Sequence, residues 1–148
     1  MTEPLDLYCT ALGMQERLLR RERGTHLRWL GAADAFIAEM ERGNSQARMA
    51  GAKVGAMAIG LAVARGRFDS SERALEAFAE EVRASAKERL PRPLDAAREA
   101  RGAFVRALVE VDADRIDAAL WALGQTAARA VLSTRFDAID AAVPGRRR

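Results

Sequence analysis

Cysteine and histidine are almost missing from this chain, whose 148 residues include one cysteine, Cys9, and one histidine, His26. A single cysteine cannot form an intrachain disulfide, and a single histidine cannot supply the several imidazoles that most zinc sites and di-iron helix bundles require. A cysteine–histidine dyad would depend on these two residues alone. Because His26 stands at the expected start of a helix, we interpret it as a surface residue. The sequence predicts no metal site, no cofactor and no enzyme.

Charge of one sign is also scarce, because 24 Lys and Arg residues are balanced by 21 Asp and Glu residues to give a formal net charge of +3. A dedicated nucleic-acid-binding protein usually carries a more one-sided field. Glu3 and Asp6 stand where a secretion signal needs a basic region followed by an apolar run. The most apolar stretch, residues 49–64, is interrupted by Lys53 and is shorter than the ~20 residues that span a bilayer. We therefore expect a cytoplasmic protein with no membrane partner.

Apolar residues recur at helical spacing from end to end. Asp69, with Glu72 three residues later, is typical of a capping box in front of the apolar positions Leu75, Phe78 and Val82. A hydrophobic content of 49% and a charged content of 30% match a globular chain, and 148 residues is a usual size for one domain. The sequence predicts an all-α fold, a single domain over residues 1–148 built as a bundle of about six helices.

Glycine and proline divide the chain into these helices. Gly24, Gly43 and Gly66 are expected to end the first three, which would begin after Thr2, at His26 and in the segment after Gly43. Two prolines cannot both continue a helical ladder. Residues 90–93, which contain the sequence Leu-Pro-Arg-Pro, are therefore the clearest break in the chain and a candidate hinge.

The third expected helix is rich in glycine. Gly51, Gly55 and Gly60 would lie roughly along one side of it, and each costs up to ~1 kcal/mol relative to alanine in a helix interior. A side without side chains lets a neighbouring backbone approach closely. We expect close packing along this side to offset the cost.

The last expected helix begins at the capping residue Asp112 and runs to Val143, where Pro144 ends it. We interpret Asp112, Asp114 and Asp117 as a cap and first-turn charges rather than as ligands of a hard cation. At ~30 residues, this helix would be longer than a domain of this size covers, and its apolar residues fall on two neighbouring stripes. One stripe is therefore predicted to contact another subunit. The predicted association surface comprises Trp121, Leu132, Phe136 and Ile139.

Residues 94–144 resemble a known helical hairpin. The runs PLDAAREARGAFVRAL and DAALWALGQTAARA, joined by an acidic turn, are similar to the hairpin of periplasmic heavy-metal sensor and resistance proteins. The membrane anchor of that family is not matched, and Cys9, His26 and the last methionine, Met57, all precede the segment. The resemblance implies the shape of a hairpin and dimer formation rather than metal sensing.

Three functions stay open on the sequence alone. The first is a non-enzymatic helical module, with a regulatory or adaptor role, that binds itself as a homo-oligomer or binds another protein. The second is a nucleic-acid-associated regulator whose arginines contact phosphates, with one strip that forms if the first helix continues through Gly24. The third is a metal-stress hairpin protein without obvious ligands. The candidate polyanion contacts are Arg17, Arg20, Arg21, Arg28, Arg146, Arg147 and Arg148, of which the last three lie in a basic tail, residues 145–148, that is expected to be disordered.

Overall fold

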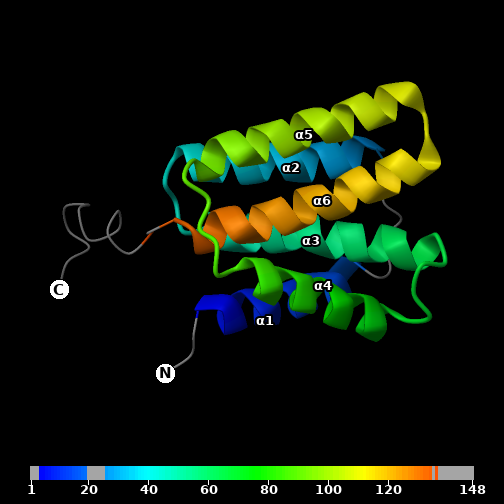
Figure 1. Cartoon of the computed structure of the whole chain (residues 1–148), viewed down its shortest axis with the longest axis horizontal. Helices are drawn as coiled ribbons and strands as arrows, with labels where there is room; N and C mark the ends of the chain where they lie inside the picture. Colours follow the sequence, from blue (N-terminus) through cyan, green and yellow to red (C-terminus); the bar gives the residue numbers. More distant parts are fainter. Residues whose placement is uncertain (1–3, 20–25, 135, 137–148) are drawn as a thin grey trace.

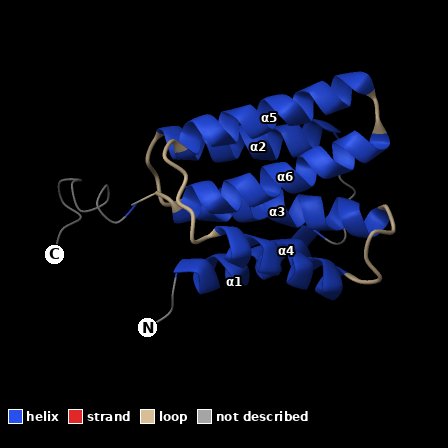
Figure 2. Cartoon of the chain, in the orientation of Figure 1, coloured by secondary structure: helices blue, strands red, loops and turns tan. Residues whose placement is uncertain are grey.

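The computed structural model describes residues 4–19, 26–134 and 136. Within these ranges every regular element is an α-helix, which confirms the predicted all-α bundle (Figure 2). The described helices are α1 (Pro4–Leu19), α2 (His26–Glu41), α3 (Ala47–Ala64), α4 (Ser71–Ser85), α5 (Pro93–Glu110) and α6 (Ala113–Leu132). The break predicted at residues 90–93 is the connection between α4 and α5, and Pro93 occupies the first turn of α5, where its missing N–H costs no hydrogen bond.

These helices stack in layers of two (Figure 1). The middle layer contains α3 and α6, one outer layer contains α2 and α5, and the other contains α1 and α4. Consecutive helices run in opposite directions along the bundle (Figure 1). Helix α3 packs against α1, α2, α4 and α6, so it is the centre of the fold.

The composition of α3 follows from this central place. Ala47–Ala64 is the one helix in the described part of the chain that is long and apolar enough to cross a membrane by length and composition alone. A helix that is apolar on all sides needs surroundings that cover every side, whether a protein core or a bilayer. In this fold 56% of the segment is buried. Contact with four neighbouring helices accounts for its apolar character.

Helices α3 and α6 approach each other most closely at two glycines, Gly55 and Gly124. A Cβ atom added to Gly124 would lie 3.1 Å from the Cα atom of Gly55, and one added to Gly55 would lie 2.8 Å from Cδ1 of Leu12. Both distances are shorter than ordinary van der Waals contacts. The expected close packing is therefore found at Gly55, and Gly124 supplies the other side of the contact.

The predicted glycine side is correct at one further position and wrong at another. A Cβ atom on Gly51 would lie 3.1 Å from the ring of Phe36, so this glycine also makes room for a neighbour. Gly60 is exposed, and a Cβ atom added to it would have no neighbour within 4 Å, so it makes no close approach. The reason is helical geometry, because a step of five positions, from Gly55 to Gly60, turns the side-chain direction by about 140° around the helix axis.

The predicted glycines follow α2 and α3, and the predicted capping aspartate begins α6. Gly43 and Gly66 follow α2 and α3 with φ values of 65° and 78°, in the left-handed region that glycine adopts without a steric penalty. Asp112 is the N-cap of α6, and its carboxylate accepts hydrogen bonds from the backbone N–H groups of Asp114 and Arg115. Capping therefore accounts for Asp112 as predicted.

The cap of α4 differs by one residue from the prediction. Ser70, rather than Asp69, is the N-cap, and its Oγ accepts a hydrogen bond from the N–H of Arg73 at 3.2 Å. Serine and aspartate are about equally good N-caps. The capping motif alone therefore does not tell which of Asp69 and Ser70 is the N-cap.

The long C-terminal helix is not confirmed, because α6 ends at Leu132. Ser133 is its C-cap, and the Oγ1 of Thr134 donates a hydrogen bond to the carbonyl of Ala130 at 2.8 Å. Serine and threonine hydroxyls compete with the helical ladder for backbone partners in this way. The predicted continuation to Val143 and the basic tail 145–148 lie outside the described residues.

Candidate functional site

The association surface predicted on α6 lies mainly inside the chain. Trp121 is 7% exposed and Phe136 is 1% exposed. Leu132 is half-buried and packs against the core, and Ile139 lies outside the described residues. Trp121 and Phe136 therefore offer almost no surface to a second subunit.

Neighbours from two segments cover Trp121. Its ring stacks on Phe68 with a centroid distance of 5.6 Å and meets the edge of Phe78 at 5.0 Å. Its indole N–H donates a hydrogen bond to the Glu81 carboxylate at 3.1 Å. Trp121 thus joins α6 to α4 and to the turn between α3 and α4.

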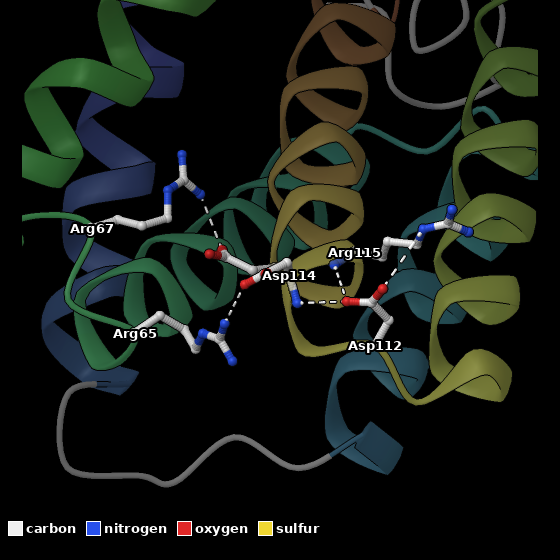
Figure 3. A network of polar contacts seen from close by, with 6 residues as sticks. Arg65, Arg67, Asp112, Asp114 and Arg115 are labelled. Atoms are coloured by element: carbon white, nitrogen blue, oxygen red, sulfur yellow. Dashed lines mark hydrogen bonds and ion pairs between the residues drawn. The ribbon is translucent and has the colours of Figure 1, made fainter.

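A charged cleft opens beside Trp121, where the turn after α3 meets the first turns of α6 (Figure 3). It has a volume of about 410 Å³, within the range of small-molecule sites. Arg65 bonds the carboxylate of Asp114 at 2.7 Å, and Arg67 bonds that of Asp117 at 3.0 Å. The Arg67 guanidinium also lies 4.8 Å from the centre of the Trp121 ring. The cleft therefore gathers two arginines, as a site for a small carboxylate would.

Each of these guanidinium groups already faces a carboxylate of its own chain. The side chain of Asp117 is 8% exposed, so its charge needs a partner, which Arg67 supplies. The side chain of Asp114 is 93% exposed, and a surface pair such as Arg65–Asp114 contributes only ~0–1 kcal/mol. The balanced charges favour neither an anion nor a cation. We interpret the two ion pairs in the cleft as contacts that hold the α3–α4 turn against α6.

The described residues contain no group of three or more His, Cys, Asp or Glu side chains that could hold a metal ion. Cys9 is half-buried in α1. Burial is the main cause that raises the pKa of its thiol; Arg83 opposes this shift and Asp6 adds to it. A thiol with a raised pKa is protonated at neutral pH and is a poor nucleophile.

Of the arginines predicted to contact polyanions, the structure describes two. Arg17 is exposed on α1, and Arg28 is exposed in the first turn of α2. Arg20 and Arg21, as well as Arg146, Arg147 and Arg148, lie outside the described residues. The predicted strip requires a first helix that continues through Gly24, which lies with residues 20–25 outside the described residues.

Helix α1 has an apolar face that the described part of the chain leaves exposed. Leu7, Met14 and Leu18 are 51%, 46% and 67% exposed. Tyr8 and Leu12, about a third of a turn or more away around the helix, are buried in the core. We call Leu7, Met14 and Leu18, with the half-buried Ala11 between them, the outer stripe. Its members are separated by four, three and four residues, which is the spacing of a helix–helix seam.

The outer stripe lies at the edge of the bundle, since α1 packs chiefly on α3 and only lightly on α4 and α6 (Figure 1). Met49 of α3, also exposed, lies beside the stripe, with its sulfur 3.0 Å from Nε2 of Gln15. The sequence analysis missed this surface because it followed only the inner positions of the helix. The signal was present, because a 16-residue helix with leucine or methionine on opposite faces cannot bury both faces against one neighbour.

Comparisons with protein families, with curated proteins and with solved structures find no match for this chain. The function of this chain must therefore be inferred from the arrangement of its own residues.

Proposed function

We propose that this chain is a non-enzymatic helical association module that pairs with a second copy of itself through the outer stripe of α1. The observation that carries the proposal is the exposure of Leu7, Met14 and Leu18 along one line of a helix whose other side is buried. Contiguous exposed apolar surface is uncommon on a monomer and usually marks a site of association.

A second copy is the occupant that the stripe fits best. The four–three–four spacing keeps all members of the outer stripe on one seam when two helices wrap around each other. A two-fold dimer uses the same patch on both chains, so one apolar stripe is sufficient for both sides of the contact. The flanking side chains Asp6 and Arg17 carry opposite charges, so the rim of the patch can also pair with itself.

Light scattering of two double variants tests the proposal. Met14→Glu/Leu18→Glu places charges in the seam, and Val109→Glu/Val111→Glu places the same number of charges on other exposed apolar residues, at the end of α5. We expect the unmodified chain and the α5 variant to have the mass of a dimer. The α1 variant should have the mass of a monomer with the same helical circular dichroism signal.

Two results would contradict this function. One is a monomeric mass for the unmodified chain at concentrations up to ~1 mM, where even a weak pair would form. The other is an α1 variant that remains dimeric, because the contact would then lie elsewhere on the molecule.

A further inference from the structure

The outer stripe also specifies how two copies meet, an inference that rests on the proposed self-association. We infer that the two α1 helices pair antiparallel about a two-fold axis, with Leu7 of each chain opposite Leu18 of the other. The inference follows from the order of large and small residues along the stripe and from the charges beside it.

The sizes of the side chains favour the antiparallel order. In sequence, the stripe reads Leu7, Ala11, Met14, Leu18. In an antiparallel pair, Leu7 meets Leu18 at both ends, and the small Ala11 of each chain meets the long Met14 of the other. In a parallel pair, Ala11 would meet Ala11 and Met14 would meet Met14, which leaves one thin and one crowded layer. Helix seams pack best where large residues face small ones.

The charges beside the stripe favour the same order. Asp6 and Arg17 are both exposed and lie eleven residues apart, which is about three turns, so they share one flank of α1. When Leu7 faces Leu18, Asp6 of each chain comes within ~3 Å along the axis of Arg17 of the other, at ~1.5 Å per residue. A parallel two-fold pair would place this flank of the two chains on opposite sides of the contact, where Asp6 and Arg17 do not meet. Only antiparallel pairing forms two symmetric ion pairs.

The ion pairs select the orientation rather than supply the affinity. Exposed pairs contribute only ~0–1 kcal/mol each. The parallel arrangement forms neither ion pair, so these flanking residues favour the antiparallel direction. Burial of the stripe residues supplies the attraction in either direction.

Cysteine cross-linking tests the register. Cys9 is the only cysteine of the chain, so Cys9→Ala gives a background without thiols. Leu7→Cys and Leu18→Cys are introduced separately in this background, one of them on a chain with a tag of different mass. The two proteins are oxidised alone and after mixing with subunit exchange. The expected result is a covalent dimer of one chain of each kind in the mixture, with at least a fivefold lower yield from either protein alone.

The alternative outcomes separate the inference from the proposed function. Efficient cross-linking of each variant with itself would overturn the antiparallel register while leaving self-association in place. A dimer by light scattering with no cross-link in any sample would also overturn the register. A monomeric mass for the unmodified chain would remove the proposed function and the register together.

A charge exchange provides a second, independent test. Asp6→Arg and Arg17→Asp should each weaken dimerisation by about tenfold, since each replaces two ion pairs with repulsion. The double variant Asp6→Arg/Arg17→Asp restores opposite charges and should bring the dissociation constant back to within about threefold of the original. A double variant that is as weak as the single variants would contradict the pairing of these residues.

Discussion

Helices α1 and α6 both carry apolar residues around more than half of their circumference, yet α1 leaves large apolar side chains exposed and the described part of α6 does not. Helix α6 is packed against α3, α4 and α5, and its Leu120 and Trp121 are buried. Helix α1 has one extensive contact, with α3, and its Leu7 and Leu18 face outward. The width of an apolar surface therefore does not tell whether a second subunit is needed. The number of neighbours that the fold provides decides this.

The comparison predicts that truncation on α6 affects folding and not association. Trp121→Ala removes a buried indole from between Phe68 and Phe78, and we expect the free energy of unfolding to fall by about 3–5 kcal/mol. Urea unfolding followed by circular dichroism measures the change. Val109→Ala, at an exposed apolar position of α5, is the matched truncation and should shift stability by less than ~0.5 kcal/mol.

A different result would restore α6 as the association surface. If Trp121→Ala left the stability of the chain unchanged but converted a dimer into a monomer, Trp121 would belong to an interface between chains. Light scattering on the same sample distinguishes this outcome from a loss of internal packing.

Glycine variants test how much the close contact between α6 and α3 contributes to the stability of the fold. Gly124→Ala puts a methyl group against the Gly55 backbone and the Phe78 ring, and it should destabilise the fold by about 1–3 kcal/mol. Gly60→Ala is the control, because the space around Gly60 is open and alanine is the better helix former by up to ~1 kcal/mol. Changes of opposite sign in the midpoint of urea unfolding are expected. A Gly124→Ala variant as stable as the original would mean that α3 and α6 can separate without cost.

The smallest predicted effect concerns the buried side of α1. The Tyr8 hydroxyl is buried with no hydrogen-bond partner among the described residues. An unsatisfied buried hydroxyl has lost its bonds to water, so Tyr8→Phe should raise the free energy of unfolding by about 1 kcal/mol. Thermal unfolding at pH 8 measures the change. A loss of more than ~1 kcal/mol would show that the hydroxyl has a partner that this structure does not identify.

Burial of Tyr8 also leads us to expect that the folded chain loses stability at alkaline pH. Burial, with a smaller contribution from Cys9, raises the pKa of Tyr8 above its usual value. The unfolded chain releases this proton near pH ~10 while the folded chain retains it, so folding stability falls as the pH rises above ~10, by up to ~1.4 kcal/mol per pH unit. Tyr8 is the only tyrosine, so absorbance at 295 nm reports its ionisation alone. Tyr8→Phe should lack this part of the decline, whereas ionisation of folded Tyr8 near pH 10 would contradict the burial.

Much of the fold was predictable because the relevant signals are local. The break at Pro91 and Pro93 and the cap at Asp112 depend on residues close together in sequence, and the structure shows both. Gly60 and the end of α6 were not predicted correctly. Placing Gly60 required counting the rotation of the helix. No glycine or proline marks the end at Leu132, where Ser133 is the C-cap and the Thr134 hydroxyl bonds the carbonyl of Ala130.

The candidate surfaces were harder to predict than the helices. Arg67 and Asp117 lie 50 residues apart, and nothing near either residue indicates the other. Gly124 stands alone in an alanine-rich helix, and only its position away from a helix end suggests a packing role. The apolar period identified two stripes on the last helix, but the neighbours of each stripe depend on how the layers stack.

The central place of α3 has a consequence for the newly made chain. Helix α6, which covers the Gly55 side of α3, leaves the ribosome only after α4 and α5. At ~5–20 residues per second, several seconds pass between the two helices. During that time α3, an apolar helix long enough to span a bilayer, is not yet packed against α6. Nascent chains that stop before α6 should therefore require chaperones to avoid aggregation.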